Sequence, residues 1–444
     1  MTRPRILLVN PWIHDFAAYD LWARPMGLLV LATRLRRMGW EVSFLDCLDR
    51  DHPSVSAPAP KVHGHGRFPR QPIPRPRALD TVPRAYSRYG VPPEYIKADL
   101  TSLPKPKVVF VTSLMTYWYP AVAETIRVVR ESLPSVPIVL GGVYAGLIPE
   151  HAQRNTGADM VVSGAAEGRL ADILSAVLGD AEVGIEDDAT PEFSPALDLM
   201  RAVRFLPLIT SRGCPFRCHY CASRRLSPHF VRRCPQDAVR EVEEAYRRYN
   251  VLDIALYDDA FLVDAPNHAL PILNAVAERV PGTRWHSPNG LHAAAIDADT
   301  ADAMKKAGFE TIRLGLESTS DLFHARTGGK VTREAFLGAV RRLRDAGFER
   351  GRIGAYLLVG IPGQTRSQIE DDVELALNAG AYPKLAEFSP IPGTAMWPAA
   401  VKRSPYPIEQ EPLFHNCTLL PAAEPEVDWG FLRKTRERIR EAFG

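Results

Sequence analysis

Short apolar runs alternate with longer segments of helical periodicity in the first half of the chain. Apolar runs at 6–9 and 41–45 predict strands, and the segment 28–38 between them has apolar residues at helical spacing and ends at Gly39. Because parallel strands need crossover helices, this order predicts a parallel sheet with helices on both faces. The later strands predicted in this way lie at 107–113, 137–142 and 159–164.

The same alternation of strand and helix resumes at residue 205. Two of the predicted helices, 299–308 and 333–347, lead into the sequence Ala-Gly-Phe, in which the glycine is a natural helix end. Six consecutive strand–helix units predict a partial (βα)6, TIM-like barrel over 205–395, with its active-site residues on the loops that follow the strands. The predicted strands lie at 205–210, 253–259, 283–290, 310–318, 354–363 and 384–393.

Three segments fall outside both patterns. Residues 51–103 form an insertion rich in proline and arginine, which we expect to be extended and only partly ordered. Its His63 and His65 are compatible with a metal site, although a solvated loop is the simpler interpretation. The acidic, aperiodic segment 179–204 predicts a linker that separates a first domain, 1–178, from the barrel, and 396–444 forms a C-terminal extension.

Composition narrows the class of protein. A chain of 444 residues suits two or three domains, and 54 basic against 52 acidic residues give no reason to expect nucleic acid as a partner. No apolar run is long enough for a membrane span. The first apolar run is bounded like a strand and not like a signal peptide. Six cysteines, three of them in one short segment, do not suggest a disulfide framework, so we expect a reducing cytoplasmic setting.

The three clustered cysteines, Cys214, Cys218 and Cys221, have the spacing Cys-x3-Cys-x2-Cys in the segment SRGCPFRCHYCAS. Three thiolates at this spacing can hold a four-iron cluster and leave one iron unligated, which is a place for another ligand. The alternatives are three unligated cysteines in a loop, or a zinc site without its fourth ligand. His219 lies within the loop, where it would compete sterically with its neighbours as that ligand.

The cysteine spacing, with Tyr220 before the last cysteine, resembles the radical S-adenosylmethionine (SAM) superfamily over 205–395. The resemblance implies a [4Fe-4S] cluster whose open iron is chelated by the amino and carboxylate groups of SAM. It also implies that SAM contacts lie at the ends of successive barrel strands. The residues predicted for SAM are Tyr220, Asp259, Asn289, Glu317, Ser318 and Gly360.

Each SAM prediction has a structural alternative. Asp258 and Asp259 at a strand end are equally well interpreted as a helix N-cap. Glu317 is a stronger candidate, because a carboxylate at the mouth of a barrel needs a partner. Gly360 and Gly363 are also compatible with a simple turn.

The first domain resembles the cobalamin-binding domain of the B12-dependent radical SAM subgroup, which has a flavodoxin-like (Rossmann-type) open parallel sheet. The resemblance rests on domain order, on the segment VTSLMTYWY and on glycines at later strand ends. The Asp-x-His-x-x-Gly motif of many cobalamin proteins is absent, and His14-Asp15 does not reproduce it. A domain that kept the fold and lost the cofactor is the alternative. The residues predicted for cobalamin are Ser113, Met115, Gly141, Gly142 and Gly164.

These resemblances imply a radical SAM enzyme that cleaves SAM to a 5′-deoxyadenosyl radical and, with cobalamin, methylates or rearranges an unactivated carbon. The alternatives are a cobalamin-independent radical SAM enzyme (a mutase, a cyclase or a peptide-modifying enzyme) and a non-catalytic iron–sulfur or cobalamin-binding protein. We expect a small-molecule or peptide substrate and an electron donor such as flavodoxin or ferredoxin. Cys234 and Cys417 do not suffice for a second cluster, and Cys47 is best explained as a buried small hydrophobe.

Overall fold

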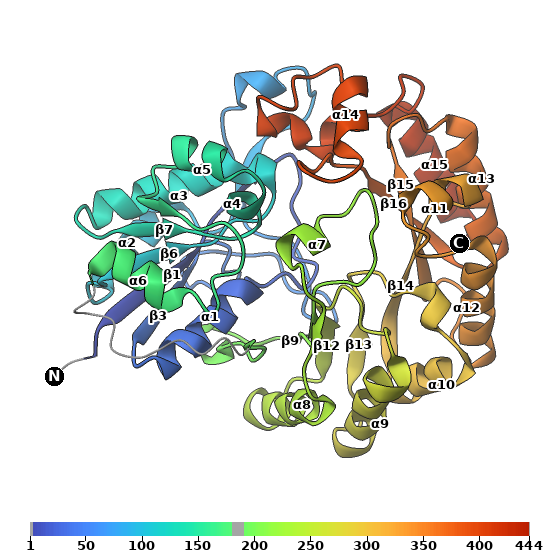
Figure 1. Ribbon diagram of the computed structural model, residues 1–444, viewed down its shortest axis with the longest axis horizontal. Coiled ribbons are helices and arrows are strands. Elements are labelled where there is room, and N and C mark those ends of the chain that lie inside the picture. Colours follow the sequence, from blue (N-terminus) through green and yellow to red (C-terminus); the bar gives the residue numbers. More distant parts are fainter. Residues whose placement is uncertain (1–2, 180–190, 444) are drawn as a thin grey trace. The chain divides into compact units, whose positions relative to one another are not determined.

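The computed structural model describes residues 3–179 and 191–443 (Figure 1). The chain divides into two compact units, Met1–Val203 and Arg204–Gly444.

The first unit is built on a five-stranded parallel sheet with the order β3-β1-β6-β7-β8. In the register, Ile6 of β1 pairs with Val42 of β3 on one side and with Val108 of β6 on the other. This sheet confirms the predicted open parallel fold. The strands are β1 (Arg5–Asn10), β3 (Glu41–Asp46), β6 (Val108–Val111), β7 (Ile138–Leu140) and β8 (Met160–Val161).

Helices cover both faces of this sheet (Figure 1). Because side chains alternate along a strand, Ile6 and Leu8 of β1 pack in one core with α1 and α6, while Leu7 and Val9 pack in the other with α3. The helices are α1 (Met26–Arg37), α2 (Pro93–Ser102), α3 (Tyr119–Ser132), α4 (Val143–Leu147), α5 (Pro149–Asn155) and α6 (Leu170–Leu178), with the 3-10 turn η2 (Thr116–Trp118).

The prediction of a partly ordered insertion at 51–103 is wrong. Two strands of this region, β4 and β5, join β2 from outside it in a three-stranded sheet with the order β2-β5-β4, and the region also forms a 3-10 turn and the helix α2. Leu79, Tyr86 and Ile96 are buried. Prolines separate these apolar residues, so they anchor the segment without producing a periodic pattern. The elements are β2 (Ile13–Asp15), β4 (Arg70–Pro72), η1 (Arg77–Leu79) and β5 (Ser87–Tyr89).

The predicted linker at 179–204 is only partly within the described residues, because 180–190 lie outside them. The part that follows packs on α1: the Thr33 hydroxyl donates to the Ser194 carbonyl at 2.8 Å, and Arg36 pairs with Asp198 at 2.9 Å. It contains the 3-10 turn η4 (Leu197–Leu199). This stretch therefore belongs to the first unit.

The second unit contains a six-stranded parallel sheet in which each strand pairs with the next one along the chain, in the order β16-β15-β14-β13-β12-β9. Consecutive parallel strands joined by outer helices form the predicted partial barrel. The strands are β9 (Leu206–Leu208), β12 (Asp253–Leu256), β13 (Arg284–His286), β14 (Phe309–Glu317), β15 (Ile353–Val359) and β16 (Tyr382–Glu387).

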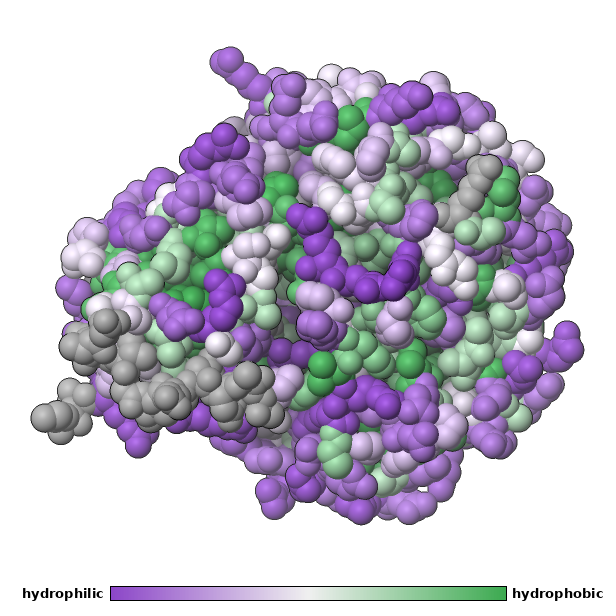
Figure 2. Space-filling model, viewed as in Figure 1, coloured by the Kyte–Doolittle hydropathy of each residue, from purple (hydrophilic) through white to green (hydrophobic). Residues whose placement is uncertain are grey.

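The two faces of the barrel sheet differ in polarity. On β14, Ile312, Leu314 and Leu316 are fully buried toward the helices, while Arg313 and Glu317 lie on the inner face. The outer helices form an arc around the strands in Figure 1, and the solvent-facing sides of α8 and α9 are mainly hydrophilic in Figure 2. These helices are α8 (Pro235–Tyr249), α9 (Ala269–Arg279), α10 (Ala298–Ala307), α12 (Arg333–Asp345) and α13 (Arg366–Asn378).

The remaining elements of the second unit lie in its connections and its C-terminal extension. The helix α15 buries Leu432 and Ile439, and its exposed basic residues include Arg438, which pairs with Glu374 of α13. No helix within the described residues has the length and apolarity that crossing a membrane requires. The elements are β10 (Ser211–Arg212), α7 (Ser223–Leu226), β11 (Val231–Arg232), η5 (Ala265–Asn267), η6 (Ala293–Ala295), α11 (Asp321–Thr327), α14 (Trp397–Arg403), η7 (Pro412–His415), η8 (Cys417–Leu419) and α15 (Trp429–Glu441).

Candidate functional site

The cysteine loop follows the first barrel strand and is framed by the antiparallel pair β10–β11. Gly213 has φ +75°, and a Cβ there would lie 2.4 Å from the His229 carbonyl oxygen, so the loop can reverse here only with glycine. Cys214 and Cys218 are partly buried, and Cys221 is exposed. The three thiols are therefore held by the loop and remain open on one side.

Two later segments of the chain clamp the middle of this loop. The His219 amide donates to the Thr327 carbonyl at 3.2 Å, and the Met396 amide donates to the His219 carbonyl at 2.9 Å. A Cβ on Gly328 would lie 2.7 Å from the Arg217 carbonyl oxygen. The loop thus has its shape fixed by the end of α11 and by the start of α14.

Lys330 supplies a positive charge beside the thiols. Burial raises the pKa of Cys214 and of Cys218, and the charge of Lys330 opposes that rise. Burial by itself would lower the pKa of Lys330, but Glu317 and the three thiols outweigh it and raise that pKa. A cation held among three thiols suits a cluster that carries three thiolates, because it compensates their negative charge.

Glu317 ends β14 and faces this group. Its Oε1 lies 3.6 Å from the Lys330 Nζ, whereas its Oε2 is buried and has no hydrogen-bond partner in the part of the chain that the structure describes. Its backbone has φ +61°, a conformation that costs a non-glycine residue about 1–3 kcal/mol and that concentrates at functional sites. A buried, unsatisfied carboxylate oxygen fits a ligand with an ammonium group, such as the amino group of SAM.

Tyr220 lies between the cysteines and the end of β15. Its ring stacks on Phe323 with centroids 6.3 Å apart, and its hydroxyl lies beside Cys218 and Glu317. Burial, followed by the charge of Glu317, raises the pKa of Tyr220, so the phenol stays protonated. A pocket of about 310 Å³ adjoins this stack. Its lining includes His219, Ser318, Phe323, Ile361 and Gly363.

Gly360 closes the end of β15 next to this pocket. It has φ +78°, and a Cβ there would lie 3.4 Å from the Ala423 side chain, so the C-terminal extension packs directly over it. The Ser389 hydroxyl donates to the His415 carbonyl at 2.6 Å and holds the same extension at the end of β16. Cys417 follows in this segment and is partly buried.

Ser318 is engaged by a neighbouring carboxylate. Its hydroxyl donates to Asp372 Oδ1 at 3.1 Å, and the Thr319 amide and hydroxyl donate to the same oxygen at 2.6 Å and 2.7 Å. Asp372 was not singled out from the sequence, because it lies within α13 and nothing in its helical pattern marks it. Ser318 therefore borders the pocket while its hydroxyl fixes the turn after Glu317.

The two aspartates after β12 have different environments. Asp258 is buried and accepts from the Thr210 hydroxyl and the Ser211 hydroxyl, both at 2.6 Å, so it anchors the start of the cysteine loop. Asp259 is exposed and interacts with Ser223 and with the charge of Lys330. Of the pair, Asp259 is the one that faces the candidate site.

Asn289 has a hydrogen-bond partner outside this group. It is exposed after β13, and its side-chain amide donates to the Tyr257 carbonyl at 3.0 Å. The structure thus gathers Tyr220, Glu317 and Asp259 around the cysteines, while it gives Asn289 a partner on the neighbouring strand loop. Lys330 was missed, because only a glycine pair before a single lysine marks it in the sequence.

The second candidate site lies at the carboxyl edge of the sheet in the first unit. The Ser113 hydroxyl donates to the Gly141 carbonyl at 2.6 Å and accepts from the Ala145 amide at 3.2 Å. Gly142 has φ +93°, and a Cβ there would lie 2.3 Å from the Ser113 carbonyl oxygen. Ser113 is itself buried, so it joins the loops after β6 and β7 and positions them.

Exposed apolar side chains and accessible glycine backbone lie at this edge. Leu114 and Met115 are 50% and 40% exposed, which is unusual for large apolar side chains. Gly141 and Gly164 have only open space where a Cβ would be. Exposed apolar side chains beside bare backbone fit a broad, flat ligand such as a corrin ring. Tyr117 is buried instead, so it packs within the unit.

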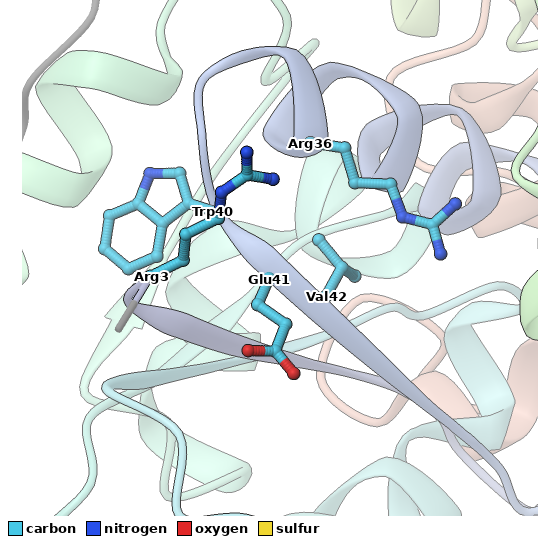
Figure 3. Close-up of a pocket in the computed structure, with 5 residues that line it drawn as sticks. All are labelled: Arg3, Arg36, Trp40, Glu41 and Val42. Carbon is cyan, nitrogen blue, oxygen red and sulfur yellow. The ribbon is translucent and has the colours of Figure 1, made fainter. Parts of the chain in front are cut away.

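A different hollow lies at the opposite edge of the same sheet. It measures about 490 Å³ and surrounds the start of β3 (Figure 3). Parallel α/β sheets bind ligands at the carboxyl ends of their strands, and this hollow lies at an amino end, so we assign it no ligand. Its lining residues are Arg3, Arg36, Trp40, Glu41 and Val42.

Two family models match the chain. Residues 208–376 match the radical SAM superfamily, and residues 85–174 match the B12 binding domain. The first match covers the cysteine loop, Glu317 and Lys330, and the second covers Ser113 and the glycines at the carboxyl edge. Both cofactor sites inferred from the geometry therefore fall within the matching family domain.

Curated relatives are similar to this chain over half of its length or more. An uncharacterized methyltransferase from Pyrococcus horikoshii is 24% identical over 67% of this chain and 70% of its own length. An anaerobic magnesium-protoporphyrin IX monomethyl ester cyclase from Synechocystis is 26% identical over 51% of each chain. This chain therefore spans about half the length of that cyclase.

Solved structures show the same fold. The radical SAM methyltransferase TsrM from Kitasatospora setae, with cobalamin and a [4Fe-4S] cluster bound, has a TM-score of 0.69 at 16% identity, over 98% of this chain and 91% of its own. The cobalamin-dependent radical SAM enzyme OxsB has a TM-score of 0.60 at 14% identity, over 99% and 61%. Residues 208–376 form a radical SAM domain, and a B12-binding domain precedes it at residues 85–174.

Proposed function

We propose that the protein is a cobalamin-dependent radical SAM methyltransferase that acts on an unactivated carbon. The observation that carries this proposal is the group formed by the three cysteines of one loop, Lys330 and the unsatisfied Glu317 oxygen at the mouth of a partial barrel. When they are bound, the cluster and SAM supply a carbon-centred radical, and cobalamin supplies a transferable methyl group.

Different residues of the barrel unit hold the cluster and SAM. Cys214, Cys218 and Cys221 ligate the cluster, and Lys330 offsets the charge of their thiolates. The free oxygen of Glu317 accepts from the amino group of SAM, which replaces an unmet hydrogen bond by a charged one. The stack of Tyr220 on Phe323 covers the site on one side and shields it from water there.

The first unit holds cobalamin at its carboxyl edge. Ser113 ties the two loops together, so that Gly141 and Gly142 present bare backbone beside Met115. Gly164 leaves the end of β8 open in the same way. Because these loops are fixed by hydrogen bonds within the unit, the edge is formed before the cofactor arrives.

The partners follow from this chemistry. We propose a small molecule or a peptide as the substrate and a flavodoxin or a ferredoxin as the electron donor. The cytoplasm suits such a protein, because a cluster held by three thiolates needs a reducing compartment. All six cysteines lie within the described residues, and none is disulfide-bonded.

The test is anaerobic reconstitution of the full chain with iron, sulfide and cobalamin, followed by incubation with SAM and dithionite. We expect 5′-deoxyadenosine to form and Cys218→Ala to abolish both the cluster absorbance and the product. Cys234→Ala is the matched control, because Cys234 is exposed and bonds to Gln236 outside the loop. An intact cluster that yields no 5′-deoxyadenosine would contradict the proposed function.

A further inference from the structure

Two basic side chains face each other on the inner side of the barrel sheet, below the cluster site. Arg313 lies on β14 and Lys384 on β16, with β15 between them. In the register, Arg313 is level with Gly354, and Lys384 is level with Tyr356. All four residues point to the inner face, because the alternate positions of these strands are buried toward the helices.

Gly354 lets the arginine cross the middle strand. A Cβ at Gly354 would lie 2.8 Å from Arg313 Cδ and 2.9 Å from its Nη1. The Arg313 side chain therefore lies over the bare backbone of β15. Its Nη1 donates to the Ile312 carbonyl at 2.8 Å, and its charge influences Tyr382 and Lys384 on β16.

The two charges influence each other. The Lys384 Nζ lies 4.7 Å from the centre of the Tyr382 ring. Burial, together with the charge of Arg313, lowers the pKa of Lys384 to about 8. The groups that face Lys384 are thus one arginine and the phenols of Tyr356 and Tyr382, and none of them is acidic at neutral pH.

The carboxylates of the same sheet are already paired. Among the residues that the structure describes, neither Arg313 nor Lys384 takes part in an ion pair, although both are partly buried. The acidic residues on these strands and their basic partners are Asp253 with Arg284, Glu310 with Arg352, Glu317 with Lys330 and Glu387 with Arg436.

Placing two like charges close together in a partly buried environment is unfavourable by itself. Contact with the Tyr382 ring favours the charged form of Lys384, but it does not account for the second cation beside it. Uncompensated charges of one sign on an inner barrel face are a feature of a binding site for the opposite charge.

We propose that Arg313 and Lys384 bind an oxyanion of the substrate, a carboxylate or a phosphoryl group. The planar guanidinium matches the two oxygens of such a group, and the ammonium adds a third donor. Four residues of strand separate Arg313 from Glu317, or about 13 Å along β14. The anionic end of the substrate is therefore held away from the cysteines while the rest reaches toward them.

This assignment rests on the proposed function, because it names the substrate class of the same barrel. The test measures anion binding by the full, cluster-loaded chain without SAM, at constant low chloride. The probes are methylphosphonate, followed by ³¹P NMR, and propionate, followed by ¹H NMR. We expect wild type to bind at least one probe, and Arg313→Gln and Lys384→Gln to weaken that binding at least about tenfold, because each removes a charged hydrogen bond.

Matched controls separate this site from surface charge. Arg279→Gln and Lys306→Gln remove the same charges from exposed ion pairs on α9 and α10, and we expect them to bind the probes like wild type. Lys384→Arg keeps the charge and should retain binding. Iron content and circular dichroism report whether each variant folds. If Arg313→Gln loses iron, the comparison of Lys384→Gln with Lys384→Arg still tests the proposal.

Wild type that binds neither probe, or controls that lose as much affinity as Arg313→Gln and Lys384→Gln, would overturn the proposal. The better probe identifies the oxyanion, carboxylate or phosphoryl. The assay needs no SAM cleavage, so its result does not depend on whether wild type forms 5′-deoxyadenosine. A failure of the proposed function is thereby distinguished from a failure of this inference.

Discussion

Gly142→Ala should separate the two cofactor sites. Gly142 precedes α4 with φ +93° and ψ −168°, a region of backbone conformation that belongs to glycine. An alanine Cβ would lie 2.3 Å from the Ser113 carbonyl oxygen and 2.5 Å from its amide nitrogen. Ordinary contacts are about an ångström longer, so the loops after β6 and β7 must move apart.

The cost of this change follows from its two parts. The backbone conformation costs alanine about 1–3 kcal/mol, and the forced loop movement costs about 1–3 kcal/mol more. A shift of this size also breaks the bond from Ser113 to the Gly141 carbonyl, which sets the shape of the edge. At 1.4 kcal/mol for each factor of ten, we expect cobalamin affinity to fall by at least about tenfold.

The assay is the amount of cobalamin and of iron per chain after anaerobic gel filtration. Gly142→Ala should lose cobalamin and keep its iron, because the cysteine loop lies in the other unit. Gly27→Ala, in helix α1 with no atom within 4 Å of the added Cβ, should keep both. Cobalamin retained by Gly142→Ala at the level of wild type would refute the placement of the site at this edge.

Three further predictions concern the barrel unit. Glu317→Gln should weaken SAM binding by roughly 10- to 100-fold in anaerobic calorimetry with iron content unchanged, since it removes a charged acceptor worth about 1.5–3 kcal/mol; unchanged affinity would rule out this carboxylate as a SAM contact. Gly328→Ala should lower the iron content because its Cβ would meet the cysteine loop. Gly329→Ala, with open space around its Cβ, should keep the iron content of wild type. Equal iron in both variants would show that the loop tolerates being displaced at Gly328. Because the pKa of Lys384 lies at about 8, propionate affinity should fall as the pH rises through that value, as NMR titrations at pH 6.5 and 9.5 would measure. Propionate keeps a single charge over this range, so a flat profile would exclude Lys384 as a binding group.

The order of strands could be predicted because each apolar run is short, bounded and followed by a helical pattern. The insertion at 51–103 could not, because its buried residues, such as Leu79 and Tyr86, are isolated between prolines and pack through tertiary contacts. The cysteine loop could be identified from its Cys-x3-Cys-x2-Cys spacing, which resembles that of the radical SAM superfamily. Its electrostatic partner, Lys330, reaches the loop only because the chain between α11 and α12 turns back toward it, which no local pattern reveals.

Ser318 shows a second limit of prediction from the sequence. Its position at a strand end predicted a ligand contact, but Asp372, more than fifty residues later, takes its hydroxyl. Glu317 could be predicted as a candidate, yet its unsatisfied oxygen and its strained backbone are visible only in the folded chain. A sequence pattern places residues at an edge, and the hydrogen bonds that compete for them decide which remain available.

The clamping of the cysteine loop bears on how the protein matures. The backbone of His219 is held by Thr327 and by Met396, which leave the ribosome more than a hundred residues after the cysteines. The thiols therefore take up their final arrangement only after residue 396 has been made. Cluster insertion is then a late event in biogenesis, and truncation before residue 396 would leave all three cysteines in place but without the scaffold that arranges them.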